Sequence, residues 1–180
     1  MSELAISACE KGGQWEKALD LFKDMRSQGI KPNVITYSAT ISACFNSHKL
    51  KEALKLLQDG QANGHFPRFS QQQSSKWDLH GFTFSESCML LSDALLFVAE
   101  SKLQESPSFM NILVVTGKGR RSSSEGPVLQ RKVPQFLKNC SGLDVTSIAG
   151  NDGRFLLKKE SVRDWSRSSR YKKFRHLMGV

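Results

Sequence analysis

Apolar residues in the first third of the chain recur every three to four positions, which is the spacing of an amphipathic helix. Gly12 and Gly13 precede the clearest such stretch, and Gly29 and Pro32 follow it. Glycine and proline end helices, so the pattern predicts one helix on each side of the Gly-Gly pair. The second helix has one broad apolar face made by Trp15, Ala18, Leu19, Leu21, Phe22 and Met25.

The same pattern occurs a second time, displaced by 35 residues. Residues 6–9, Ile-Ser-Ala-Cys, are identical to residues 41–44. Ten identities at one offset without a gap indicate an internal repeat. Each unit is expected to be a helical hairpin that buries its apolar face only by stacking on a neighbour. The other six identities pair Ala18, Leu19, Leu21, Asp24, Gly29 and Pro32 with Ala53, Leu54, Leu56, Asp59, Gly64 and Pro67.

Residues 29–38, Gly-Ile-Lys-Pro-Asn-Val-Ile-Thr-Tyr-Ser, resemble the junction between two pentatricopeptide repeats, which are RNA-binding helical hairpins with a 35-residue period. The resemblance implies a partial repeat at residues 1–33, a complete repeat at 34–68, and binding of single-stranded RNA at about one base per repeat. It also implies which side chains read the base, namely Ser38 and Arg68 in the complete unit and Glu3 and Asn33 in the first. Arg68 departs from the usual Asn or Asp, so no base is assigned.

Met1 falls partway through the first helix of the first unit. Fewer than two full repeats give little stacking, and such arrays usually need three or more. We therefore expect this chain to be the C-terminal end of a longer array, or a truncated gene model, whose other part holds any targeting segment and most RNA contacts.

A second region begins after residues 69–76, which are polar, lack an apolar period and predict a flexible linker. If residues 77–81 form a strand, Asp78 and His80 point from one face. Thr83-Phe84-Ser85-Glu86 is a helix start signal. It predicts a helix from about Ser85 to Leu103, with a buried side made by Cys88, Leu90, Leu91, Ala94, Leu95, Phe97, Val98 and Leu103.

The apolar run at residues 110–115 predicts a central strand covered on at least one face by helices. A second helix is expected at residues 126–138, and short strands at 145–149 and 154–158 flank the turn Asn151-Asp152-Gly153. The order is β-α-β-α-β-β, a two-layer α/β domain at residues 77–158. The fold class is therefore α+β multidomain, with a fragment of an α-solenoid followed by this α/β domain.

The formal net charge of +9 favours phosphate-rich partners. Residues 159–180 contain seven Lys and Arg against Glu160 and Asp164, with Trp165, Tyr171 and Phe174 among them. This basic tail suits phosphate contact with base stacking, and a disordered solubilising end is the alternative. No run of 18 apolar residues exists, so we expect a soluble protein without a membrane partner. The widely spaced cysteines predict reduced thiols and no zinc site.

Three short motifs resemble the signatures of a small MutS-related (Smr) domain, in the order and on the elements expected of one. The resemblance implies a nicking endonuclease on DNA, an endoribonuclease, or a member that only binds. Threonine at position 116, where bacterial members often carry His, resembles the eukaryotic branch fused to repeats. That combination implies RNA processing in a chloroplast or mitochondrion, although Glu3 and Glu10 argue against a transit peptide in the visible chain. The motifs are Asp78-Leu79-His80-Gly81, Thr116-Gly117-Lys118-Gly119 and Asn151-Asp152-Gly153-Arg154-Phe155.

The same residues suit phosphodiester chemistry without the resemblance. His80 suits acid–base work near neutral pH. Asp78 can orient His80, activate water or hold a divalent cation such as Mg²⁺ or Mn²⁺. Gly117 and Gly119 let backbone N–H groups approach a phosphate. Positive charge would come from Lys118, Arg120, Arg121 and Arg154.

Several classes of function are excluded and three remain. The spacing of a nucleotide-hydrolysing P-loop and that of a dinucleotide fingerprint are both absent, and no small-molecule substrate is expected. The sequence leaves RNA cleavage centred on Asp78 and His80, a non-catalytic nucleic-acid-binding module, and DNA nicking. The structural alternative is that Asp78 caps the backbone and His80 packs against the helix start.

Overall fold

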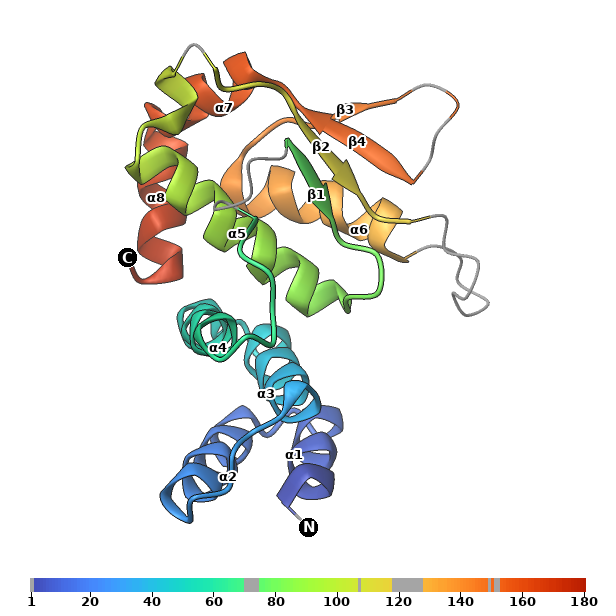
Figure 1. Ribbon diagram of the computed structural model, residues 1–180, viewed down its shortest axis with the longest axis vertical. Helices are drawn as coiled ribbons and strands as arrows, with labels where there is room; N and C mark the ends of the chain where they lie inside the picture. Colours follow the sequence, from blue (N-terminus) through green and yellow to red (C-terminus); the bar gives the residue numbers. More distant parts are fainter. Residues whose placement is uncertain (1, 70–74, 107, 118–127, 149, 151–152) are drawn as a thin grey trace. The chain divides into compact units, whose positions relative to one another are not determined.

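The computed structural model (Figure 1) describes residues 2–69, 75–106, 108–117, 128–148, 150 and 153–180 of the 180-residue chain. The chain divides into two compact units, one ending at Pro67 and one beginning at Arg68. No helix in these described ranges is long and apolar enough to cross a membrane.

The first unit consists of two helical hairpins, as the repeat predicted. Helices α1 (Ser2–Lys11) and α2 (Trp15–Ser27) form the first, and α3 (Val34–Asn46) and α4 (Leu50–Ala62) form the second. The 35-residue offset is visible in the turns. The N–H of Gln14 donates to the carbonyl of Cys9 at 2.9 Å, and the equivalent N–H of Lys49 donates to Cys44 at 2.8 Å. Equivalent residues thus make equivalent helix ends.

Aromatic packing joins the two hairpins. The Tyr37 side chain on α3 is 1% exposed. Its ring lies 5.1 Å from that of Phe22 on α2 and 6.3 Å from that of Phe66, measured between centroids. The α2 residue therefore packs against the second hairpin, as a stacked repeat requires.

The second unit contains a four-stranded sheet in the order β1-β2-β4-β3. Strand β1 (Lys76–Asp78) is parallel to β2 (Ile112–Val115), and β4 (Arg154–Leu157) is antiparallel to both β2 and β3 (Thr146–Ser147). With helices α5 (Phe84–Glu100) and α6 (Val128–Phe136) between the strands, the element order is the predicted β-α-β-α-β-β.

One face of the sheet is packed and the other is open. Trp77, Val114 and Phe155 are aligned across three strands and are all buried. In the adjacent row, Lys76 is exposed and Leu113 and Leu156 are half-buried. Helices α5 and α6 contact each other, so they lie on the same face of the sheet. The predicted cover on at least one face is thus confirmed, and the domain has two layers.

Helix α5 begins where its start signal predicted. The Thr83 hydroxyl accepts from the N–H of Glu86 at 3.3 Å, and the Glu86 carboxylate accepts from the N–H of Thr83 at 2.7 Å. The predicted end was wrong, because the helix stops at Glu100 and Leu103 lies in a short 3₁₀ turn, η2 (Leu103–Glu105). Phe97 was also wrongly assigned to the buried side, since it is 41% exposed.

The basic segment after β4 is folded. Helices α7 (Lys159–Ser166) and α8 (Ser169–Met178) bury Trp165 and Phe174, which are 4% and 0% exposed. The indole N–H of Trp165 donates to the carbonyl of Ser141 at 2.6 Å. The alternative of a disordered end was therefore wrong, and the burial of Trp165 and Phe174 also contradicts the expectation that these two rings stack on bases.

Candidate functional site at the sheet edge and the repeat surface

Asp78 and His80 form a direct pair, although not on one strand as predicted. Strand β1 ends at Asp78, and His80 lies in the turn before α5. The Asp78 side chain shapes that turn, because its Oδ1 accepts the backbone N–H of His80 at 3.1 Å and lies 2.7 Å from His80 Nδ1. A carboxylate that bonds the backbone two residues on is a common turn device. Here it also orients an imidazole.

The electrostatics of the pair favour an ionised Asp78. Partial burial by itself would raise the pKa of Asp78, but the hydrogen bonds from the side chain and backbone of His80 and from Lys76 outweigh it. They hold the pKa of Asp78 below its ordinary value. The His80 side chain is 72% exposed and that of Asp78 is 32% exposed. The imidazole is therefore accessible to a large substrate.

The second motif meets this pair through the sheet. Asp78 is in register with Val115, the last residue of the parallel strand β2, so the residues after both strands emerge at one edge. Gly117 has φ +79°, and a Cβ there would lie 3.3 Å from His80 Cβ. The carbonyl of Gly117 accepts from Gln130 Nε2 on α6 at 2.8 Å, which anchors the start of this loop. Lys118, Gly119, Arg120 and Arg121 lie outside the described residues.

The third motif reaches the same edge from the antiparallel strand. Arg154 begins β4, is exposed, and is in register with Val115. Asp78, Val115 and Arg154 thus form one row across the sheet (Figure 1). Asn151 and Asp152, from the same motif, are not among the described residues.

Thr116 has a structural contact that the sequence did not reveal. It is 5% exposed, and both its N–H and its hydroxyl donate to the carbonyl of Gly153, at 2.9 and 3.2 Å. These bonds tie the end of β2 to the residue before β4. A hydroxyl committed in this way is not presented to a ligand, so we expect Thr116 to position the edge and not to contact nucleic acid.

In the first unit, the structure joins the two residues expected to read one base. The Asn33 amide donates to Glu3 Oε1 at 2.9 Å. Its oxygen caps α3 by accepting from the N–H of Thr36 at 3.0 Å. In the second repeat, Ser38 is half-buried on α3 and Arg68 is exposed.

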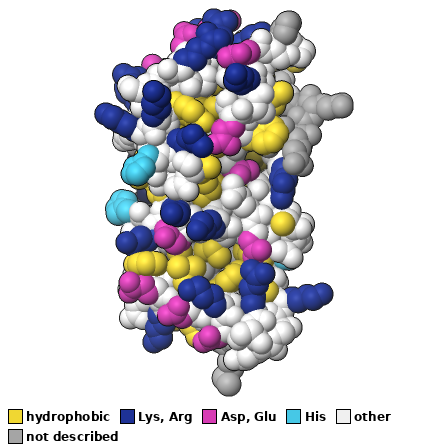
Figure 2. Space-filling view, turned by 90° about the vertical axis from the view of Figure 1, so that its left-hand side faces the viewer, with side chains coloured by type: hydrophobic (Ala, Val, Ile, Leu, Met, Phe, Trp, Pro, Cys, Tyr) yellow, Lys and Arg dark blue, Asp and Glu magenta, His cyan; other side chains and the backbone are white. Residues whose placement is uncertain are grey.

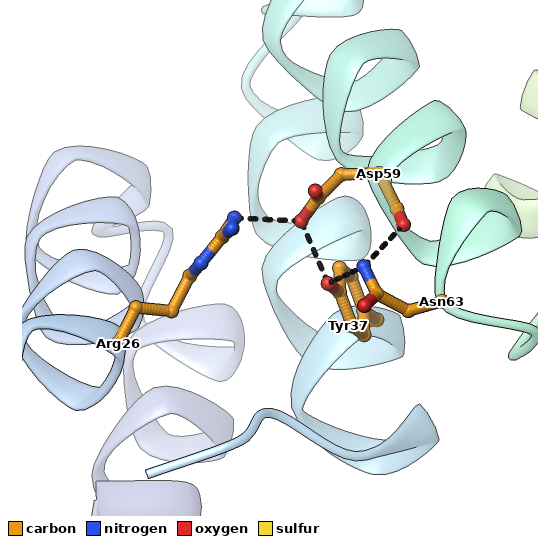
Figure 3. A network of polar contacts seen from close by, with 4 residues as sticks. All are labelled: Arg26, Tyr37, Asp59 and Asn63. Carbon is orange, nitrogen blue, oxygen red and sulfur yellow. Dashed lines mark hydrogen bonds and ion pairs between the residues drawn. The ribbon is translucent and has the colours of Figure 1, made fainter. Parts of the chain in front are cut away.

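A polar network in the first unit was not predicted (Figure 3). The Tyr37 hydroxyl donates to Asp59 Oδ2 at 2.7 Å, and Arg26 Nη1 contacts the same oxygen at 2.8 Å. Asn63 Nδ2 donates to the Tyr37 hydroxyl at 3.3 Å. Asp59 was recognised only as a repeated residue, because its partners come from helices that sequence alone does not bring together. The network links α2 of one hairpin to α3 and α4 of the next.

Among the described residues at the sheet edge, both carboxylate oxygens of Asp78 already have partners, which does not suit a tightly held divalent cation. Asp78 Oδ1 is engaged by His80, and Oδ2 lies 3.4 Å from Lys76 Nζ. Within the described part of the chain, no group of three or more His, Cys, Asp and Glu side chains is arranged to hold a metal ion.

Comparison with known protein families identifies the repeats. A family model described as the PPR (pentatricopeptide) repeat family matches residues 4–46, and one described as the PPR repeat matches residues 35–65. Similar stretches occur in three pentatricopeptide repeat-containing proteins of Arabidopsis thaliana. A chloroplastic one is 44% identical over 45 residues, which is 25% of this chain and 7% of the relative. A second is 42% identical over 50 residues, which is 28% of this chain and 9% of the relative. A mitochondrial one matches with the same four values. The matched segment thus spans less than a tenth of each relative.

Proposed function

We propose that this chain, whose residues 4–65 are pentatricopeptide repeats, binds RNA through them and acts on the bound RNA through a Smr-type domain that begins at β1. Proteins with such repeats bind RNA, which supports the first half of the proposal. The contact between Glu3 and Asn33 also supports it, because two side chains expected to meet one base are adjacent.

The observation that carries the second half is the Asp78–His80 pair, 2.7 Å apart and next to Gly117. With Nδ1–H directed to Asp78, the Nε2 atom of a neutral His80 is left as a proton acceptor. In this proposal His80 Nε2 accepts the proton of the attacking oxygen, from water or a ribose 2′-hydroxyl, as that oxygen forms a new P–O bond, and His80 later releases the proton to solvent. The P–O bond to the leaving ribose oxygen then breaks, and that oxygen takes a proton from solvent. Asp78 stabilises the imidazolium that forms.

The exposure of His80 favours a macromolecular substrate. A side chain that is 72% exposed does not enclose a small molecule, but it can reach a phosphodiester on the outside of an RNA strand. Arg154, exposed in the same row as Asp78, and the basic residues of 118–121 would neutralise that phosphate. Because both oxygens of Asp78 already have partners among the described residues, no step is routed through a metal ion.

A non-catalytic binding module is the second candidate, and the residue type and the hydrogen bond of Thr116 favour it. This position supplies no second imidazole, and its hydroxyl is committed to Gly153. The basic edge would then only hold the phosphate backbone.

A cleavage assay separates these candidates. Labelled single-stranded RNA, structured RNA and supercoiled plasmid are offered side by side to the wild-type chain, to Asp78→Asn and to His80→Gln. We expect both variants to lose RNA cleavage by at least the ~100-fold typical of a positioned acid–base group, while RNA affinity stays unchanged.

His176→Gln is the matched control, because His176 is an exposed histidine on α8. Equal cleavage by wild type, Asp78→Asn and His80→Gln would refute the assignment. Binding without turnover in the wild type would favour the module, and plasmid nicking alone would favour DNA as the substrate.

The relatives also suggest where the chain works. Two of those described above are named as chloroplastic and mitochondrial. We therefore propose RNA processing in one of these organelles, which a fluorescent fusion of the full-length gene product would test.

A further inference from the structure

A second basic surface lies in the α/β unit, away from the predicted motifs. The π-helical turn η3 (Leu137–Ser141), which continues α6, and helix α8 border an open groove of about 420 Å³. Its lining includes three basic side chains, Lys138, Arg170 and Lys173, and one acidic side chain, Asp144. Arg170 and Lys173 belong to the basic tail that the sequence analysis singled out for phosphate contact, whereas Lys138 and Asp144 belong to no predicted motif.

The charges of this groove are less compensated than those of Arg167 and Arg175, which also lie on or next to α7 and α8. Arg167 pairs with Glu105 at 3.1 Å, and Arg175 pairs with Glu100 at 3.4 Å. Among the described residues, no carboxylate lies within ion-pair distance of the three basic groups of the groove. Figure 2 shows Lys and Arg side chains, with Asp and Glu side chains among them, on the face of the molecule that carries α7 and α8.

The backbone holds one of these cations in place. Gly142 ends η3 in the left-handed region with φ +69°, and a Cβ there would lie 2.6 Å from Arg170 Cδ. The absence of a side chain thus lets Arg170 lie directly over the backbone. Its Nη1 donates to the carbonyl of Gly142 at 3.2 Å. The remaining N–H groups of the guanidinium are left for a ligand, and their planar fork matches phosphate oxygens.

We propose that this groove binds the phosphate backbone of RNA, as a contact separate from the repeats and from the Asp78–His80 edge. This inference rests on the proposed function, since that function supplies RNA as the ligand. A fixed arginine flanked by two lysines suits a strand with regularly spaced phosphates. The groove is a partly open hollow on the surface of the α/β unit, so a polymer strand can reach it.

The test is the salt dependence of RNA affinity, measured with the full chain and a labelled single-stranded oligouridylate between about 50 and 200 mM salt. Each phosphate contact on a single strand contributes about 0.7 to the slope of log affinity against log salt. The double variant Lys138→Gln/Lys173→Gln should therefore lower that slope by about 1.4 relative to wild type.

The matched control is Lys102→Gln/Lys172→Gln. It removes the same charge from exposed positions, one of them on α8 beside Lys173, but neither residue lines the groove. It should leave the slope within a few tenths of wild type. A third variant, Gly142→Ala, keeps every charge but displaces Arg170. It should weaken RNA binding while circular dichroism shows an unchanged fold.

The outcomes are distinct. Equal loss of slope in both double variants, or in neither, overturns the groove and leaves the proposed function standing. A wild-type chain that binds no RNA overturns both. If the Lys138→Gln/Lys173→Gln variant loses binding to anionic vesicles or to polyglutamate while its RNA binding is unchanged, the groove serves a membrane or an acidic protein. That result would also overturn this proposal.

Discussion

At the scale of single residues, the two hairpins solve one packing problem in different ways. Met25 on α2 is 3% exposed, and its equivalent 35 residues later is Gly60. The space at Gly60 is taken by Phe66, since a Cβ at residue 60 would lie 2.7 Å from Phe66 Cδ2. The equivalent of Phe66 in the first repeat is Lys31. The substitutions at these two positions therefore compensate each other.

This compensation predicts a non-additive pair. Gly60→Met alone should lower the free energy of unfolding by about 1–3 kcal/mol through overpacking. Adding Phe66→Lys should restore part of that loss, because positions 60 and 66 then carry the same residues as the equivalent Met25 and Lys31 of the first repeat. Urea denaturation of the wild type, the two single variants and the double variant measures the coupling. If the changes in unfolding free energy of the two single variants simply add up in the double variant, residues 60 and 66 do not compete for the same space.

Tyr37 gives a second prediction, on pH. Burial, followed by the hydrogen bond and negative charge of Asp59, raises the pKa of Tyr37 from 10.0 to about 12. The folded chain then holds a proton that the unfolded chain loses, so this contribution to stability is complete below pH 10 and is lost as the pH rises from 10 to about 12. Tyrosinate absorbance should show the late titration, and denaturation across this range should show the falling stability. Tyr37→Phe should remove that part of the pH dependence, and a Tyr37 that ionises at 10 would contradict the assignment.

At the scale of elements, helix starts were more predictable than helix ends. The Thr83–Glu86 capping box is a local hydrogen-bond pattern, so four residues were enough to locate the start of α5. The end of α5 was missed, because Leu103 continues the apolar period beyond the residue where the backbone turns. Lys102, with φ +55°, makes that turn, so the sequence contains no glycine there that would predict the end of the helix.

Helices α7 and α8 show the opposite error, since a basic composition concealed two packed helices. Trp165 carries much of this packing, with its ring 5.6 Å from that of Phe174 and its N–H bonded to Ser141. We predict that Trp165→Ala lowers the free energy of unfolding of the second unit by about 3–5 kcal/mol.

The measurement is denaturation followed by the near-ultraviolet signal of Trp77, which lies in the sheet of the same unit. Trp15→Ala is the control, because Trp15 belongs to the first unit and its loss should leave the Trp77 signal unchanged. A Trp165→Ala chain as stable as wild type would mean that α7 and α8 contribute little to the second unit.

At the scale of the whole molecule, the element order and the meeting of the three motifs at one sheet edge depend on different kinds of information. The β-α-β-α-β-β order follows from apolar spacing and turn residues, which are local. The meeting of Asp78, Gly117 and Arg154 follows from a parallel pair and an antiparallel pair sharing β2. The groove at Arg170 depends on a helix packing beside a glycine 28 residues earlier.

Local patterns in the sequence were therefore enough to predict the repeat, its helical hairpins and the order of strands and helices, because each depends on neighbours a few positions apart. The folded chain was needed to show that Asp78 pairs with His80 outside a strand and that Thr116 is buried against Gly153. It was likewise needed to show that the basic C-terminal residues fold. Each of these depends on contacts that close loops of the chain or remove side chains from water, and no local pattern records which partner a side chain will meet.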